Sequence, residues 1–193
     1  MEQSIFTSER ISSENTISAS RATGIVAAAT VEVRPPVKST SVPARAPNVF
    51  HVKLSLKTTE RLQFIDITEQ VIELTRESGI QTGMVNIQTR HTTTAIVVNE
   101  AEPLLLDDMR QTLDRIAPPD QYYKHNDFSI RTVNMEEEET GNGHSHCQAL
   151  YLRASETLNL IDGGLQLGRW QRIFFIELDH ARDRMVSIMV IGQ

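Results

Sequence analysis

Residues 84–92 of this chain read Met-Val-Asn-Ile-Gln-Thr-Arg-His-Thr, and apolar side chains recur at every second position. Successive side chains of a β-strand point to opposite faces, so this alternation predicts a half-buried strand. Val85, Ile87, Thr89 and His91 then share one face. His91 ends that face, where a buried surface opens at the edge of a sheet. The stretch therefore predicts a piece of the core with a histidine at its rim.

Six further segments have the apolar content and spacing of strands. They are residues 50–57, 95–98, 147–152, 157–161, 170–178 and 185–191. The last two are expected to form a hairpin through the polar residues 179–183. The segment 147–152 directly follows His146, so the predicted strand there fixes the direction of that histidine.

Two main helices are predicted between these strands. Asp66 and Glu69 have the spacing of a capping box at the start of the first helix, and Gly79 ends it. Pro103 at a first helical position starts the second helix, which ends before Pro118. About seven mostly antiparallel strands with two main helices predict an α+β fold.

The 193 residues are 39% hydrophobic and 23% charged, which is typical of a globular domain. Residues 1–48 are rich in Ser, Thr, Ala and Arg, and we expect a disordered extension there, before a domain at residues 49–193. An organelle-targeting role of this extension stays open. No apolar run approaches the roughly 20 residues of a membrane helix, so no membrane partner is expected.

The formal net charge is −6. This acidity argues against a nucleic-acid partner, because contacts to phosphates need a basic surface. Cys147 is the single cysteine, so no intrachain disulfide can form. This usage suits a reducing compartment, and a cytoplasmic location is expected.

Three histidines end strands or lie in polar loops: His91, His125 and His146. Neutral imidazole is a common metal ligand, and three imidazoles with one open position suit a catalytic zinc-type site. Their separations match no short metal signature, so a set of unrelated polar histidines is the alternative. His144 is either a fourth, auxiliary ligand or a loop residue.

Two carboxylates and an arginine could complete such a site. Glu100 could act as a general base or orient a histidine, or it could simply favour the start of a helix. Asp108 could orient a histidine or lie on a solvated helix face. Arg90 and Thr93 could contact a phosphate. The acidic run at residues 136–139 is expected to be a solvated loop, and His180 a turn residue.

Five motifs, taken in order, resemble the YjbQ-like family, whose members are also described as secondary thiamine-phosphate synthases. The resemblance covers the chain from about Phe50 to the C-terminus. The motifs are Arg90-His91-Thr92-Thr93 with Asn99-Glu100, then Asp108, Tyr123-Lys124-His125-Asn126, Gly143-His144-Ser145-His146 and Leu165-Gln166-Leu167-Gly168-Arg169-Trp170-Gln171. Two positions depart from the family pattern: Arg169 replaces a usually small residue, and His180-Ala181 replaces Gly-Pro.

The resemblance implies a compact α+β trimer with a site at or near subunit boundaries. It also implies thiamine-phosphate synthase activity, which joins a pyrimidine pyrophosphate to a thiazole phosphate. His91, His125 and His146 would bind a divalent metal, zinc or a similar ion, with magnesium as another option.

His91, Glu100, Asp108 and His146 are the expected catalytic residues, and Arg90, Thr93 and Asn99 the expected contacts to a small phosphorylated metabolite. The alternatives are a metal-dependent hydrolase of a small metabolite and a non-catalytic metabolite-binding trimer.

Overall fold

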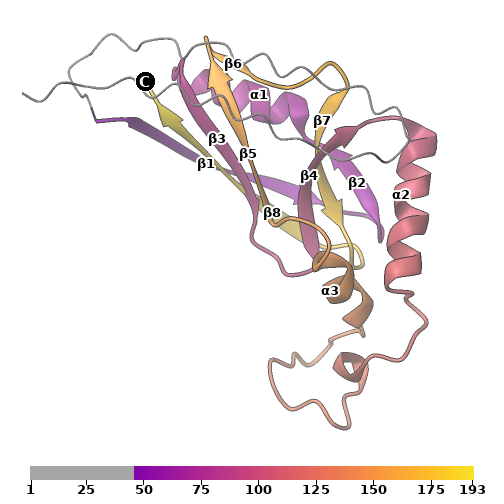
Figure 1. Cartoon of the computed structure of the whole chain (residues 1–193). Coiled ribbons are helices and arrows are strands. Elements are labelled where there is room, and N and C mark those ends of the chain that lie inside the picture. The colour runs from indigo at the N-terminus through magenta and orange to yellow at the C-terminus, as the bar shows by residue number, and fades with distance from the viewer. Residues whose placement is uncertain (1–45) are drawn as a thin grey trace, which may run out of the picture. The chain divides into compact units, whose positions relative to one another are not determined.

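The computed structural model describes residues 46–193 (Figure 1). The expected extension, residues 1–48, lies almost wholly outside this range. The first strand, β1, begins at Asn48.

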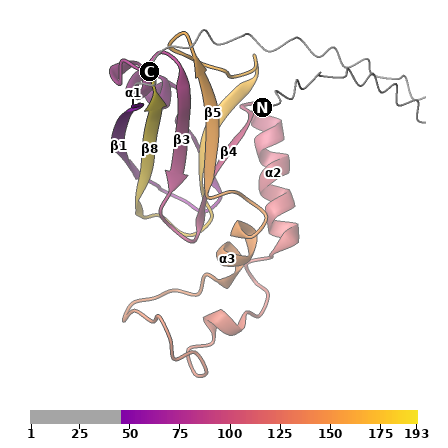
Figure 2. The same ribbon diagram turned by 60° about the vertical axis from the view of Figure 1, so that its left-hand side comes forward.

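Within residues 46–193, eight strands form two antiparallel sheets (Figures 1 and 2). The larger sheet has the order β1 (Asn48–Lys57), β8 (Asp183–Gly192), β3 (Gly83–Thr89), β5 (Ser155–Ile161) and β6 (Gly164–Leu165). The smaller sheet has the order β2 (Gln63–Asp66), β7 (Gln171–Glu177) and β4 (Thr94–Glu100). With the helices below, this confirms the predicted α+β fold.

The main core lies between the two sheets. Val85 and Ile87 of β3 and Ile188 of β8 face Ile96 of β4 and Phe175 of β7, and all five side chains are fully buried. The helix α1 (Thr68–Glu77) adds its buried residue Val71 to the same cluster. The period-two stretch that predicted β3 therefore supplies part of the core between the sheets.

The helix α2 (Pro103–Ile116) covers the opposite face of the smaller sheet (Figure 2). Its buried residue Leu113 packs with Ala95 of β4 and Phe174 of β7 in a second cluster. Pro103 begins the helix as predicted, and the side chain of Glu102 accepts hydrogen bonds from two backbone N–H groups of the first turn. The domain thus has three layers: the larger sheet, the smaller sheet and α2.

The outer face of the larger sheet carries no covering element within residues 46–193. Strand register places Val49 of β1, Ile191 of β8 and Met84 of β3 in one row on this face. Val49 is 62% exposed and Met84 is 52% exposed.

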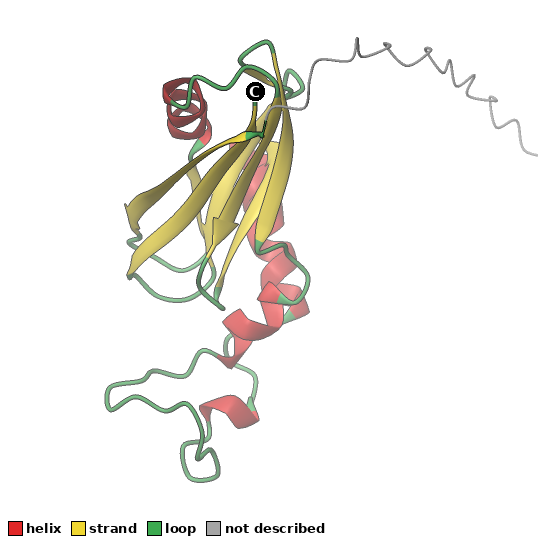
Figure 3. Cartoon of the chain, turned by 90° about the vertical axis from the view of Figure 1, so that its left-hand side faces the viewer, coloured by secondary structure: helices red, strands yellow, loops and turns green. Residues whose placement is uncertain are grey.

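The short helix α3 (Gly143–Ala149) and the loop before it extend beyond one end of the sheets (Figure 3). The prediction of a strand at residues 147–152 is wrong, because α3 runs through Ala149 and turns follow it. Two buried polar residues hold the helix in place. Ser145 Oγ donates to the Leu178 carbonyl at 2.7 Å, and Gln148 Nε2 donates to the Leu113 carbonyl of α2 at 3.0 Å.

Three further expectations are corrected by the structure. Residues 179–183 do not close a hairpin, because β7 and β8 belong to different sheets. Asp66 does not form a capping box with Glu69; it accepts from Thr68, and both carboxylates bind Arg172 of β7. The short strands β2 and β6 were not predicted. None of the helices within residues 46–193 is long and apolar enough to span a membrane.

Candidate functional site

The candidate site is a pocket of about 480 Å³ at the end of the domain that carries α3. The turn between β3 and β4, the connection between β7 and β8, and the loop leading into α3 supply its walls. The lining residues are Arg90, His91, Thr92, Thr93, His125, Arg131, Asn134, Glu136, Glu138, Glu139, Asn142, His146, Asp179, His180, Arg182 and Arg184. None of them is apolar, so the pocket suits a polar ligand.

A buried ion pair supports the pocket from behind. Arg184 donates from Nε and Nη2 to the two oxygens of Glu177, at 2.6 and 2.7 Å. The carboxylate of Glu177 also accepts from Thr58 Oγ1 and from the backbone N–H of Asp179, both at 3.0 Å. Arg184 Nη2 further donates to Thr93 Oγ1 at 3.2 Å. Because both charges are paired and hydrogen-bonded, the cluster holds Thr93 and the start of β8 in fixed positions.

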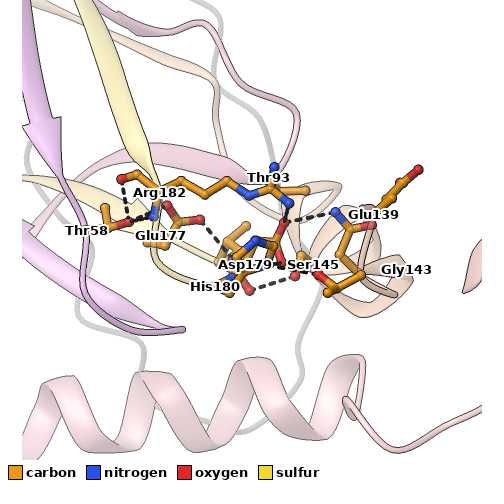
Figure 4. A network of polar contacts seen from close by, with 12 residues as sticks. Thr58, Thr93, Glu139, Gly143, Ser145, Glu177, Asp179, His180 and Arg182 are labelled. Carbon is orange, nitrogen blue, oxygen red and sulfur yellow. Dashed lines mark hydrogen bonds and ion pairs between the residues drawn. The ribbon is translucent and has the colours of Figure 1, made fainter. Parts of the chain in front are cut away.

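Asp179 ties α3 to the connection between β7 and β8 (Figure 4). It accepts from Asn142 Nδ2 and from the backbone N–H of His180, each at 2.9 Å, and lies 3.2 Å from Arg182 Nη2. Burial alone would raise the pKa of Asp179, but these hydrogen bonds and the charges of His180 and Arg182 hold that pKa below its usual value. The ionised carboxylate therefore orients Arg182 toward the pocket.

His91 follows β3, as predicted, and its ring is anchored on β8. The backbone N–H of Met185 donates to His91 Nε2 at 3.0 Å. Burial and the nearby charge of Arg184 lower the pKa of His91, while Glu177 opposes the shift. His91 is therefore a neutral imidazole at neutral pH.

His125 and His146 both line the pocket and pack directly against each other. Their ring centroids are 4.7 Å apart, with an edge-to-face geometry. Glu139 lies 3.9 Å from His125 Nε2 and accepts from Arg131 at 2.7 Å. Burial, followed by the charge of His125, lowers the pKa of His146. His146 is thus also neutral, and it can exchange a proton with a ligand.

The three predicted metal ligands line one pocket but do not form a metal centre. Within residues 46–193, no three His, Cys, Asp or Glu side chains are arranged to hold a metal ion. The physical reason at His91 is that Nε2 already accepts a backbone hydrogen bond, so its lone pair is engaged. His125 Nε2 and Glu139 Oε2 are buried without a hydrogen-bond partner, and His146 packs against His125. While Met185 engages Nε2 of His91, the His91–His125–His146 set of one chain does not fit a metal ion, and no chemical step below depends on one.

The other predicted residues divide between two places. Arg90 and Thr93 line the pocket, and Arg90 is exposed there. Asn99 and Asp108 instead line a separate, mostly apolar pocket of about 310 Å³ between α2 and the smaller sheet. Glu100 is exposed at the end of β4, about 20 Å along the strand from the histidine turn. Within one chain, these three residues do not meet the histidines.

His144 is buried, and neither ring nitrogen has a hydrogen-bond partner. It packs near Tyr123, with ring centroids 6.4 Å apart, and does not line the pocket. Burial and the charge of Arg61 lower its pKa. His144 therefore helps to pack α3 against the rest of the domain and is not part of the candidate site.

Several pocket residues carried no clear signal in the sequence. Glu139 lies in the acidic run predicted as a solvated loop, Arg131 lies before that run, and Asp179 and Arg182 lie in the predicted hairpin turn. One available signal was the pair of charges Glu177 and Asp179 at the end of an apolar strand, since buried carboxylates need partners.

Residues 52–193 match the family model described as UPF0047 protein YjbQ-like. A UPF0047 protein of Methanothermobacter thermautotrophicus is 38% identical over 145 residues, which cover 75% of this chain and 94% of that protein. The UPF0047 protein YugU of Bacillus subtilis is 34% identical, with 72% and 97% covered. A Sulfolobus solfataricus crystal structure, described as a YbjQ-like protein of unknown function, is 31% identical, covers 76% of this chain and 99% of that one, and has a TM-score of 0.68. The chain therefore belongs to the UPF0047, YjbQ-like family.

Proposed function

We propose that this chain is an enzyme that binds a small phosphorylated metabolite in the histidine pocket and has thiamine-phosphate synthase activity. In that reaction the thiazole nitrogen forms a bond to the methylene carbon of the pyrimidine substrate. The bond from this carbon to the pyrophosphate oxygen breaks, and pyrophosphate leaves. Such a displacement depends on groups that stabilise the negative charge of the leaving group.

One observation carries the proposal: every side chain that lines the histidine pocket is polar or charged, and four of them are arginines. The Arg182 side chain is 34% exposed and is held by Asp179, 3.2 Å from its Nη2. A phosphate oxygen can accept from Arg182, and the exposed Arg90 can add a second positive charge at the rim.

The histidines supply a hydrogen-bond donor beside these cations. His146 is neutral for the reasons given above and lies against His125. A neutral imidazole keeps its N–H, so it can donate a hydrogen bond to a pyrophosphate oxygen as negative charge moves to the leaving group. Arg90, Arg182 and Thr93 then bind and orient the ligand, and His146 stabilises the leaving group through this hydrogen bond.

A homotrimer is part of the same proposal. The resemblance implied it, and the uncovered face of the larger sheet supports it. Asn99, Glu100 and Asp108 stand apart from the histidines within one chain, so any shared role in one site would need neighbouring copies. The cytoplasmic location stays a prediction.

The test is an assay of thiamine phosphate formation by the purified chain, together with calorimetric titration of pyrophosphate. We expect Arg182→Met to weaken pyrophosphate binding and His146→Ala to lower turnover about a hundredfold or more, as for loss of one donor that stabilises developing negative charge. Arg153→Met is the matched control, because the Arg153 side chain is 74% exposed and outside the pocket. Unchanged turnover in folded His146→Ala would remove His146 from the reaction.

The same measurements separate the alternatives. Binding of pyrophosphate without turnover identifies a non-catalytic metabolite-binding protein. Hydrolysis of the substrates that a chelator abolishes, and that added zinc restores, identifies a metal-dependent hydrolase instead.

A further inference from the structure

The anchoring of His91 determines which of its ring nitrogens carries the proton. A backbone N–H can only donate, and the N–H of Met185 points at His91 Nε2 at 3.0 Å. Nε2 must therefore accept, and it cannot hold a proton while this hydrogen bond exists. In the neutral ring the proton then belongs to Nδ1.

The strand register explains why this backbone N–H is available. β3 pairs with β8 as far as Thr89, which lies opposite Val186. The residue of β8 next to Val186 is Met185, and β3 has already ended at that level, so no residue of β3 pairs with Met185. The ring of His91, two residues beyond Thr89, takes the place of the missing strand partner. If the ring were turned by 180°, a C–H group would face the N–H of Met185, and this N–H would have no acceptor. The ring orientation with Nε2 toward Met185 is therefore the one that pairs both the N–H and the ring nitrogen.

We propose that His91 serves the pocket as a hydrogen-bond donor: a neutral imidazole whose Nδ1–H binds an anionic oxygen of the ligand. It is then neither a metal ligand nor a general base. The phosphate identity of that oxygen rests on the proposed function, whereas the position of the proton rests on the contact with Met185 alone.

The surroundings of the ring suit this role. His91 lines the polar pocket beside Arg182 and Arg184, and Nδ1 has no hydrogen-bond partner within residues 46–193. Burial and the charges of the two arginines oppose an imidazolium at this place, while Glu177 partly offsets them. Because Arg184 and Arg182 are each paired with a carboxylate, a phosphate oxygen here needs a further donor, and the neutral ring can supply one.

The proton position can be measured without any ligand. We suggest long-range ¹H–¹⁵N spectra of the full chain labelled with ¹⁵N-histidine at neutral pH, with the His91 signals assigned by their loss in His91→Gln. The expected result is a neutral ring protonated on Nδ1. A ring protonated on Nε2, or on both nitrogens, would overturn the proposal whatever the protein catalyses.

Two substitutions separate the donor from the anchor. Asparagine places its amide where Nδ1 stood, so His91→Asn keeps a donor toward the pocket and loses the acceptor for Met185. Glutamine reaches the position of Nε2, so His91→Gln keeps the acceptor and loses the donor. We expect His91→Gln to fold like the wild type and to bind pyrophosphate roughly tenfold to a hundredfold more weakly, the effect of one hydrogen bond to a charged group.

His91→Asn is expected to bind pyrophosphate more tightly than His91→Gln and to unfold more easily. The reverse order of affinities, or equal affinities, would overturn the donor role. If the wild type binds no pyrophosphate, the proposed function and the phosphate contact both fail, while the spectra still decide where the proton lies.

Discussion

At the scale of single residues, the buried pair of Arg184 and Glu177 is the feature on which the pocket depends. Glu177 is fully buried and Arg184 is 7% exposed, so neither charge has water as an alternative partner. We predict that Arg184→Met lowers the free energy of unfolding by about 3–5 kcal/mol, because an unpaired carboxylate stays buried. Denaturant unfolding followed by circular dichroism measures this.

A surface arginine provides the control for that prediction. Arg153 pairs with Glu156 while its side chain is 74% exposed. Arg153→Met should change the free energy of unfolding by less than about 1 kcal/mol, as is usual for exposed ion pairs. Equal effects of the two substitutions would contradict the view that burial makes the Arg184 pair important.

Asp179 makes a pH-dependent contribution to stability. Its pKa is lowered in the folded chain, so its stabilising effect is present above the unfolded pKa of about 3.9 and is lost as pH falls through the folded value. We predict that Asp179→Asn is less stable than the wild type at neutral pH. The difference in unfolding free energy should shrink as pH is lowered from about 6 to about 3.

The control for the pH effect is Asp120→Asn, at an exposed loop position. Its difference from the wild type should stay small throughout the same pH range. A difference for Asp179→Asn that is constant with pH would show that the carboxylate is not the group whose charge matters.

The histidines show how far the sequence alone could lead. His91 was predicted at the end of a buried strand face, and it lies there because β3 ends at Thr89. His146 lines the same pocket as His91, but the strand expected to direct it is a helix in the structure. The hydrogen bond that engages His91 Nε2 comes from Met185, 94 residues later, and no local pattern reveals such a contact.

At the scale of elements, the pairing of β3 with β8 depends on two glycines. Gly83 lies opposite Gly192, and a Cβ on Gly83 would stand 2.0 Å from the Ile191 carbonyl oxygen. We predict that Gly83→Ala separates the ends of these strands and lowers the free energy of unfolding by about 3 kcal/mol or more, as overpacking against the backbone does. Thermal and denaturant unfolding test this.

Gly164 is the matched control, because it also lies in a strand of the larger sheet. The nearest heavy atom to a Cβ there is the Ile161 carbonyl oxygen, at an ordinary distance of 3.5 Å. Gly164→Ala should therefore leave the stability within about 1 kcal/mol of the wild type. Similar losses in both variants would show that close approach is not the cause.

The elements that were mispredicted share one physical reason: distant contacts decide them. Residues 147–152 alternate like a strand. However, Ser145 donates to the Leu178 carbonyl just after β7, and Gln148 donates to the Leu113 carbonyl of α2. These two distant contacts stabilise a helix there instead. The apolar segments at β7 and β8 were found, yet their assignment to different sheets depends on β4 and β1 as partners. Strongly periodic segments and proline or glycine boundaries were predictable, because they depend on neighbouring residues alone.

At the scale of the whole molecule, the layers leave one large surface without a partner. α2 covers the smaller sheet, whereas nothing within residues 46–193 covers the outer face of the larger one. Apolar side chains such as Val49 and Met84 are exposed on it among polar residues. This surface is where the proposed trimer can bury the apolar area that one chain leaves open.

We therefore predict that the wild type elutes at about three times the chain mass of 21.7 kDa, and that Met84→Lys dissociates it into folded monomers. Met84 is 52% exposed in the single chain, so lysine is tolerated there, whereas a lysine ammonium buried between subunits costs several kcal/mol. Light scattering after size-exclusion chromatography gives the mass, and circular dichroism reports the fold.

Leu104→Lys is the control, because Leu104 is 73% exposed on α2, at the opposite side of the layers. This substitution should leave the trimer intact. A Met84→Lys protein that keeps the trimer mass would place the interface on another surface, and a monomeric wild type would remove the trimer from the proposal.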